Sequence, residues 1–239
     1  MFNSNKALFS AIVLATGLFS AAAQAAPFSS ATTFIDISSL QVQTTGTATF
    51  ALNGLDDYNG TVEVPSQFAE TFIAEDLSVD HLAVDTADIE MQAGSHLAAV
   101  SVADSDGFAD SFASVFLGYD VDGVGDVIVS FDYSINAGLF DTTDPLAFAF
   151  AQVALDSAGG SDDALLDFDG SLADISNFLD GSLSVTIAVS GSDSDDIFLS
   201  AVAVAQTNIA PLTVSVPAPT SALLLLPGLL LGWRLRRDR

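Results

Sequence analysis

The sequence predicts an all-β protein: one antiparallel β-sandwich of jelly-roll type, formed by residues 26–206. Three observations lead to this prediction. Apolar residues alternate with polar or small ones over many short runs, as in strands with one buried face. Glycine, serine and asparagine separate the runs, and the acidic residues are 27 Asp against 4 Glu, a bias that favours turns over helices. The sequence has no repeat of fixed length, which argues against a β-solenoid.

The expected strands follow one another along this domain. Residues 32–37 predict the first strand, and residues 40–52 predict the second, with Leu40, Val42 and Phe50 on one face. Turn sequences such as Asp122-Gly123 bound the later runs. These runs predict further strands at residues 97–103, 115–119, 126–135, 146–155, 183–189 and 197–204.

Two segments predict short helices instead. They are residues 66–74 and 171–178, where Ser66 and Ser171 could act as N-caps. The 18 phenylalanines alternate within strands, and we expect them in the core. We expect two sets of alternating alanines on a partly covered outer face: Ala147, Ala149 and Ala151, and Ala201, Ala203 and Ala205.

Charge is distributed very unevenly. The formal net charge is −26, and residues 7–233 contain no lysine or arginine. Nucleic acid is therefore excluded as a direct partner, and anionic lipid surfaces are disfavoured. No carboxylate in the domain can pair with Lys or Arg, so each must be solvated, hydrogen-bonded or metal-bound. The chain also has no cysteine, so packing or bound ions must stabilise the domain.

The N-terminus has the features of a secretory signal peptide, residues 1–25. Lys6 precedes the apolar run Ala7–Ser20, and small residues follow at Ala23 and Ala25, so we expect cleavage after Ala25. The alternative is an uncleaved membrane anchor. The apolar run is shorter than the roughly 20 residues that a spanning helix needs, which favours cleavage.

The C-terminus combines three parts after a linker of residues 207–215. Val216, Pro217, Ala218 and Pro219 end any preceding strand. Residues 221–233 are apolar but short for a full span, and Pro227 and Gly228 weaken them as a helix. Three arginines that would remain on the cytoplasmic side follow: Arg234, Arg236 and Arg237. We expect transient insertion in the inner membrane.

This order of parts, residues 216–239, resembles the PEP-CTERM sorting signal of Gram-negative bacteria. The resemblance implies recognition by an exosortase, a membrane sorting enzyme that cuts near the proline motif. It also implies export through the inner membrane to the cell surface or extracellular matrix, and association with exopolysaccharide and biofilm. The usual Pro-Glu-Pro is here Pro217-Ala218-Pro219. The alternative is a plain single-span tail anchor with no sorting enzyme.

Clustered aspartates are candidate Ca²⁺ ligands, because Ca²⁺ takes several oxygen ligands and glycines allow a tight loop. One loop carries Asp120, Asp122 and Asp126, and a weaker copy carries Asp104, Asp106 and Asp110. Similar clusters occur at residues 167–170 and 193–196. None matches an EF-hand or a calcium β-roll. The alternative, favoured for any single cluster, is a simple hairpin turn.

The sequence gives no support for an enzyme. His81 and His96 have no metal-ligand spacing and are expected at exposed positions, and no Gly-x-Ser-x-Gly motif is present. We therefore expect a non-catalytic structural protein of the surface or matrix. The alternative is a Ca²⁺-dependent carbohydrate-binding module, for which Tyr58 and Tyr119, each beside aspartates, are the suggestive aromatics.

Overall fold

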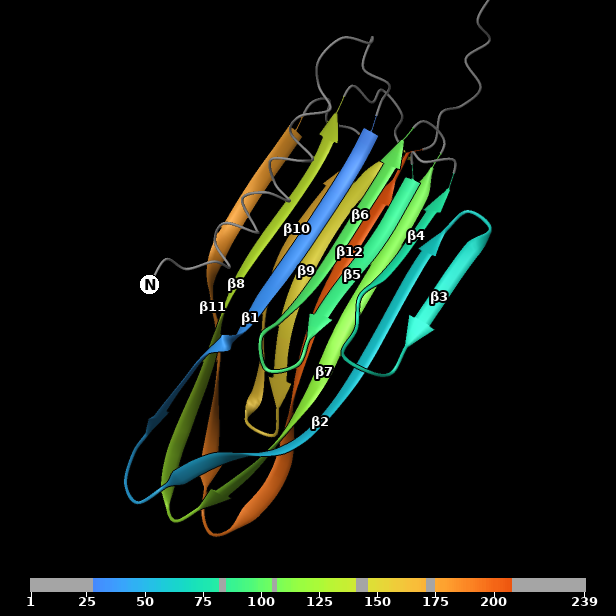
Figure 1. Ribbon diagram of the computed structural model, residues 1–239. Helices are drawn as coiled ribbons and strands as arrows, with labels where there is room; N and C mark the ends of the chain where they lie inside the picture. Colours follow the sequence, from blue (N-terminus) through green and yellow to red (C-terminus); the bar gives the residue numbers. More distant parts are fainter. Residues whose placement is uncertain (1–27, 82–84, 105–106, 141–145, 171–174, 208–239) are drawn as a thin grey trace, which may run out of the picture. The chain divides into compact units, whose positions relative to one another are not determined.

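The computed structural model describes residues 28–81, 85–104, 107–140, 146–170 and 175–207. They form two six-stranded antiparallel sheets that share one hydrophobic core (Figure 1). Sheet A has the order β11 (Ile175–Val189), β8 (Gly125–Phe140), β1 (Phe28–Thr44), β6 (His96–Asp104), β5 (Asp85–Gln92) and β4 (Leu77–His81). Sheet B has the order β10 (Gly160–Asp169), β9 (Phe148–Ser157), β12 (Asp193–Gln206), β7 (Phe108–Asp122), β2 (Thr49–Val64) and β3 (Gln67–Thr71).

The all-β prediction is confirmed at this level, and most expected strands lie inside longer observed ones. Three expectations are wrong, the last in its described part. Residues 40–52 are not one strand, because a turn at residues 45–48 separates β1 from β2. Residues 66–74 are not a helix, because β3 occupies Gln67–Thr71. The described part of the second expected helix, residues 175–178, belongs to β11.

The turn before β3 explains the wrong helix prediction. Ser66 has a positive φ of 72° and follows Pro65, whose ring fixes φ near −65°. Proline followed by a residue with positive φ is the pattern of a type II turn. Ser66 therefore reverses the chain into the β2–β3 hairpin, whereas the same Pro-Ser pair also suits the first residues of a helix. No helix among the residues described above is long and apolar enough to cross a membrane.

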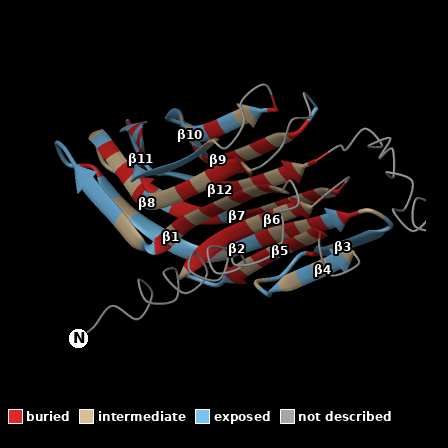
Figure 2. Cartoon of the chain, turned by 90° about the horizontal axis from the view of Figure 1, so that it is seen from above, coloured by how far each residue is buried: buried red, intermediate tan, exposed pale blue. Residues whose placement is uncertain are grey.

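In sheet B, alanines lie in the core and several phenylalanines lie on the outer face, which is the opposite of the expectation from the sequence. Ala149, Ala151, Ala201 and Ala203 are all fully buried between the sheets. Phe148 and Phe150 alternate with the β9 alanines and face outward, where they are half-buried. Figure 2 shows this alternation of buried and half-buried residues along the central strands. On the outer face, Phe116 is 42% exposed and its ring lies 4.7 Å from that of Phe198.

Small residues fill the core where the sheets approach closely. The Ser101 hydroxyl, on β6 of sheet A, donates to the carbonyl of Ala203 on β12 of sheet B at 2.8 Å. The Ser111 hydroxyl on β7 donates to the carbonyl of Val100 at 2.7 Å, so the bonds run in both directions between the sheets. Facing sheets usually lie about 10 Å apart. A side chain as short as serine can bridge them only where the separation is smaller, which leaves no room for phenylalanine.

Both ends of the described domain meet at the same end of the sheets. Phe28, at the start of β1, pairs with Asp104 of β6. Thr207, directly after β12, donates its hydroxyl to the carbonyl of Asp104 at 2.7 Å. Its backbone N–H also donates to the carbonyl of Gly107 at 2.9 Å. Thr207, which the sequence analysis placed at the start of a linker, is thus hydrogen-bonded into the domain.

Candidate functional site

The first candidate calcium loop forms the hairpin turn between β7 and β8. Gly123 has a positive φ of 98°, as a tight turn requires. The turn pairs with the neighbouring β1–β2 turn, since Thr47 N–H donates to the carbonyl of Val124 at 2.8 Å. Thr45 N–H donates likewise to the carbonyl of Asp126 at 2.9 Å. The segment therefore forms a hairpin turn that is hydrogen-bonded to the β1–β2 turn.

Each aspartate in this turn has its own environment. The Asp120 carboxylate accepts the Ser194 hydroxyl at 2.6 Å, and the Asp122 carboxylate accepts the Ser192 hydroxyl at 2.6 Å. The bond from Ser192, followed by that from the Gly123 N–H, lowers the pKa of Asp122. Asp126 is the second residue of β8, in the other sheet, so the three carboxylates are divided between two sheets.

The second candidate loop is divided in the same way. Asp104 ends β6 in sheet A, and its N–H donates to the buried carboxylate of Asp85 at 3.0 Å. Asp110 lies on β7 in sheet B, where burial and then the charge of Glu63 raise its pKa. Asp106 lies outside the described residues. Across the described ranges, no three histidine or acidic side chains gather in a group that could hold a metal ion.

Hydroxyl groups take the place of lysine and arginine as partners of the carboxylates. Besides the two serine–aspartate pairs in the β7–β8 turn, the Ser182 hydroxyl donates to Asp132 at 2.6 Å and the Ser38 hydroxyl donates to Asp36 at 2.5 Å. These bonds satisfy one acceptor oxygen without adding a cation. These four carboxylates are therefore hydrogen-bonded while the domain keeps its negative charge.

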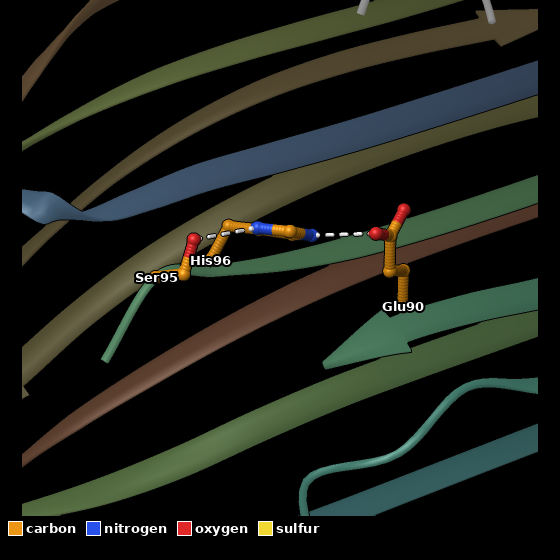
Figure 3. A network of polar contacts seen from close by, with 3 residues as sticks. All are labelled: Glu90, Ser95 and His96. Atoms are coloured by element: carbon orange, nitrogen blue, oxygen red, sulfur yellow. Dashed lines mark hydrogen bonds and ion pairs between the residues drawn. The ribbon is translucent and has the colours of Figure 1, made fainter. Parts of the chain in front are cut away.

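Ser95, His96 and Glu90 form a hydroxyl–imidazole–carboxylate chain on sheet A (Figure 3). The Ser95 hydroxyl lies 3.1 Å from His96 Nδ1, and His96 Nε2 lies 3.0 Å from a Glu90 oxygen. His96 is only 8% exposed and stacks on Phe34, so the expectation that it is exposed is wrong.

Two backbone N–H groups beside the Ser95–His96–Glu90 arrangement, those of Gly94 and Ser95, already have hydrogen-bond acceptors. A reacting carbonyl needs free N–H groups aimed at its developing oxyanion. Gly94 N–H already donates to the Tyr58 hydroxyl at 3.3 Å, and Ser95 N–H donates to the carbonyl of Gln92 at 2.9 Å. The contacts of His96 with Ser95 and Glu90 therefore link the β5–β6 turn to strand β5.

A cleft of about 470 Å³ lies between the sheets, at the β11–β12 turn. One wall is Thr186–Val189 of the edge strand β11, and the other is formed by the start of β12 with Tyr119 and Val121 of β7. In register, Asp195 is opposite Tyr119 and Asp193 is opposite Val121. Opposed residues of an antiparallel pair share a face, so both aspartates project from the inner face of sheet B.

Tyr119 is the distinctive residue of this cleft. It is 1% exposed and its ring stacks on Phe50 with centroids 5.3 Å apart. Within the part of the chain that the structure describes, its hydroxyl has no hydrogen-bond partner. Burial, followed by the charges of Asp195, Asp193 and Asp196, raises its pKa to about 12, so the hydroxyl keeps its proton at neutral pH. The sequence associated Tyr119 with Asp120, whereas the structure places it beside Asp193 and Asp195.

Comparison with protein-family models, with curated proteins and with solved structures finds no match to this chain. The residues expected to direct export lie outside the described ranges: the cleavage residues Ala23 and Ala25, the motif Val216 to Pro219, and Arg234, Arg236 and Arg237.

Proposed function

We propose that this protein is an exported, non-catalytic structural component of the cell surface or extracellular matrix, delivered by an exosortase-type sorting enzyme. The observation that carries the proposal is the order of parts in residues 216–239: a proline motif, a short apolar run and an arginine-rich end. The signal-peptide pattern of residues 1–25 supports it, because an exported chain must first enter the secretory route.

The folded domain is compatible with such a role. It has no disulfide to form after export, since the chain has no cysteine. Its core of closely spaced sheets with interior serine bonds supports stability through packing.

We also propose that the β-sandwich is of jelly-roll type. A jelly roll folds a long antiparallel hairpin over itself, so successive strand pairs alternate between its two sheets. Pairing of β1 with β8 in sheet A, and of β2 with β7 in sheet B, supports that description.

The test is the intact mass of the extracellular protein taken from its native host. We expect an N-terminus after Ala25 and a C-terminus near residues 216–220, alone or with an added group. The matched control is a chain in which Pro217 and Pro219 are both replaced by alanine, which we expect to keep its tail and remain cell-associated. A mass that extends through Arg239 in the wild-type protein contradicts the sorting proposal.

A further inference from the structure

We propose that the cleft between β11 and β12 is a binding site for a sugar residue that carries no negative charge. The inference does not depend on the sorting of the tail, because every group it uses lies in the described domain. It rests on a cleft, two inner-face carboxylates and the hydroxyl of Tyr119, a residue that is 1% exposed and lines the cleft.

The cleft offers hydrogen-bond donors as well as acceptors. Asp193 and Asp195 supply carboxylate oxygens, which accept hydroxyl protons. Tyr119 supplies an O–H, which stays protonated at neutral pH. Among the described strands, β11 pairs with β8 alone, so half of its peptide groups point to its outer edge, where the Ser184 N–H already donates to the Asp162 carboxylate at 2.8 Å. Residues 186–189 therefore add N–H donors and carbonyl acceptors to the wall.

Mixed donors and acceptors suit a polyhydroxylated ligand better than a bare cation. A cation uses only oxygen ligands and leaves N–H groups without a role, and no group of three acidic or histidine side chains occurs in the described ranges. Each sugar hydroxyl both donates and accepts, so one ring can bond the carboxylates and the Tyr119 hydroxyl together.

Charge decides which sugars can enter. The charges of Asp193 and Asp195 at the cleft, and the smaller effect of Asp196 on the other face of β12, all act on Tyr119, and residues 7–233 have no lysine or arginine to offset them. A uronic acid or a sulfated sugar is therefore repelled. Neutral and amino sugars are accepted, the amino sugars with added attraction between their ammonium group and the carboxylates.

The test is calorimetric titration of the full-length protein in detergent with three oligosaccharide probes. These are a neutral β-glucan oligomer, a chitosan oligomer and an oligomer of uronic acid, each with and without a chelator of divalent ions. We expect the first two probes to bind in both conditions and the uronic acid oligomer not to bind.

Two variants locate the site. Tyr119→Phe removes only the hydroxyl and keeps the ring on Phe50, and Asp195→Asn keeps the shape of the side chain. Each is expected to weaken sugar binding about 5- to 30-fold, as loss of one buried or charged hydrogen bond does. The matched controls Tyr133→Phe and Asp167→Asn lie away from the cleft and should bind as the wild type does. Thermal unfolding of each variant verifies that it is folded.

Three results overturn the proposal. The first is that neither the neutral nor the amino-sugar probe binds the wild-type protein at millimolar concentration. The second is that folded Tyr119→Phe and Asp195→Asn bind sugar as tightly as the wild type does. The third is that Ca²⁺ binds and lowers the pKa of Tyr119, that the Asp195→Asn variant no longer binds Ca²⁺, and that no sugar probe binds. This result would assign the cleft to a cation.

Discussion

The hydroxyl of Ser101 on one sheet donates to the carbonyl of Ala203 on the facing sheet at 2.8 Å. The two serine oxygens of the facing strands, Ser101 and Ser111, also lie 2.9 Å apart. In this half of the core the sheets are thus bridged by serine side chains, and alanine is the largest residue that several inner positions accept. Larger aromatic residues are consequently found on the outer face of sheet B.

The first prediction concerns this narrow core. Ala203→Leu adds volume where Ser101 already reaches the facing backbone, and overpacking of this kind costs about 1–3 kcal/mol of unfolding free energy. Val202→Leu, one residue earlier and on the outer face, should change stability little. Urea denaturation of both variants measures the difference. Equal stability of the two would show that the core has spare room.

The second prediction compares two glycines with positive φ. Gly54 has φ 72° and open space around it, so Gly54→Ala should cost only the left-handed backbone strain, about 1–2 kcal/mol. Gly46 has φ 64°, and a Cβ there would lie 2.3 Å from the carbonyl oxygen of Val124. Gly46→Ala should therefore cost clearly more, because it also separates the β1–β2 turn from the β7–β8 turn.

Chemical denaturation of the two alanine variants tests this comparison. A Gly46→Ala variant no less stable than Gly54→Ala would show that the two turns do not depend on each other.

The third prediction concerns Asp110, whose pKa is raised by burial and by Glu63 opposite it. A carboxyl with a raised pKa in the folded state adds stability while it is protonated, and that stability is lost as pH rises from the ordinary value of 3.8 through the folded pKa. Asp110→Asn should therefore unfold at a higher temperature than the wild type at neutral pH, and this gain should vanish in acid.

Asp167→Asn is the matched control for Asp110→Asn. Asp167 lies in the same register row on the exposed edge strand β10, so its replacement should leave the pH profile unchanged. Glu63→Gln should reproduce part of the gain. A gain that persists below the ordinary pKa of aspartate would mean that charge is not its cause.

The fourth prediction concerns alkaline pH. The pKa of Tyr119 is raised from 10.0 to about 12, so between these values the unfolded chain loses a proton that the folded chain keeps. Stability must therefore fall as pH rises through that window. Absorbance of the tyrosinate band should show a last ionisation near pH 12 that is missing in Tyr119→Phe. If the Tyr119→Phe variant still shows an ionisation near pH 12, Tyr119 is not the tyrosine whose pKa is raised to that value.

The strands could be predicted from the sequence because alternation of apolar residues survives in most of them. Which face is buried could not be predicted in β9, where phenylalanine and alanine alternate and both are apolar. The choice between Phe150 and Ala149 depends on the distance between the sheets, which is a tertiary property. Strands β3, β4, β5 and β10 were not predicted. Three of them, β3, β4 and β10, lie at sheet edges and leave many polar residues exposed, whereas β5 lies between β4 and β6.

Of the candidate sites, one could be predicted from the sequence and the other could not. Spacing identified the turn at Asp120–Asp126, since turn residues act locally. The cleft could not be predicted, because register brings Tyr119 and Asp195 together across 76 positions of the chain (195 − 119). No local pattern reports such a pairing. Residues 193–196 stood out only as one aspartate cluster among several.

The position of Thr207 has a mechanical consequence. β12 is an inner strand of sheet B, held by β7 on one side and β9 on the other, and the chain leaves it at the end where Thr207 is hydrogen-bonded to Asp104. A pull on the following residues acts along the strand and loads both ladders of hydrogen bonds at once, in shear. If an edge strand were pulled perpendicular to its axis, its hydrogen bonds to the neighbouring strand would instead break one at a time. A domain tethered through this end can thus bear tension without unravelling from its point of attachment.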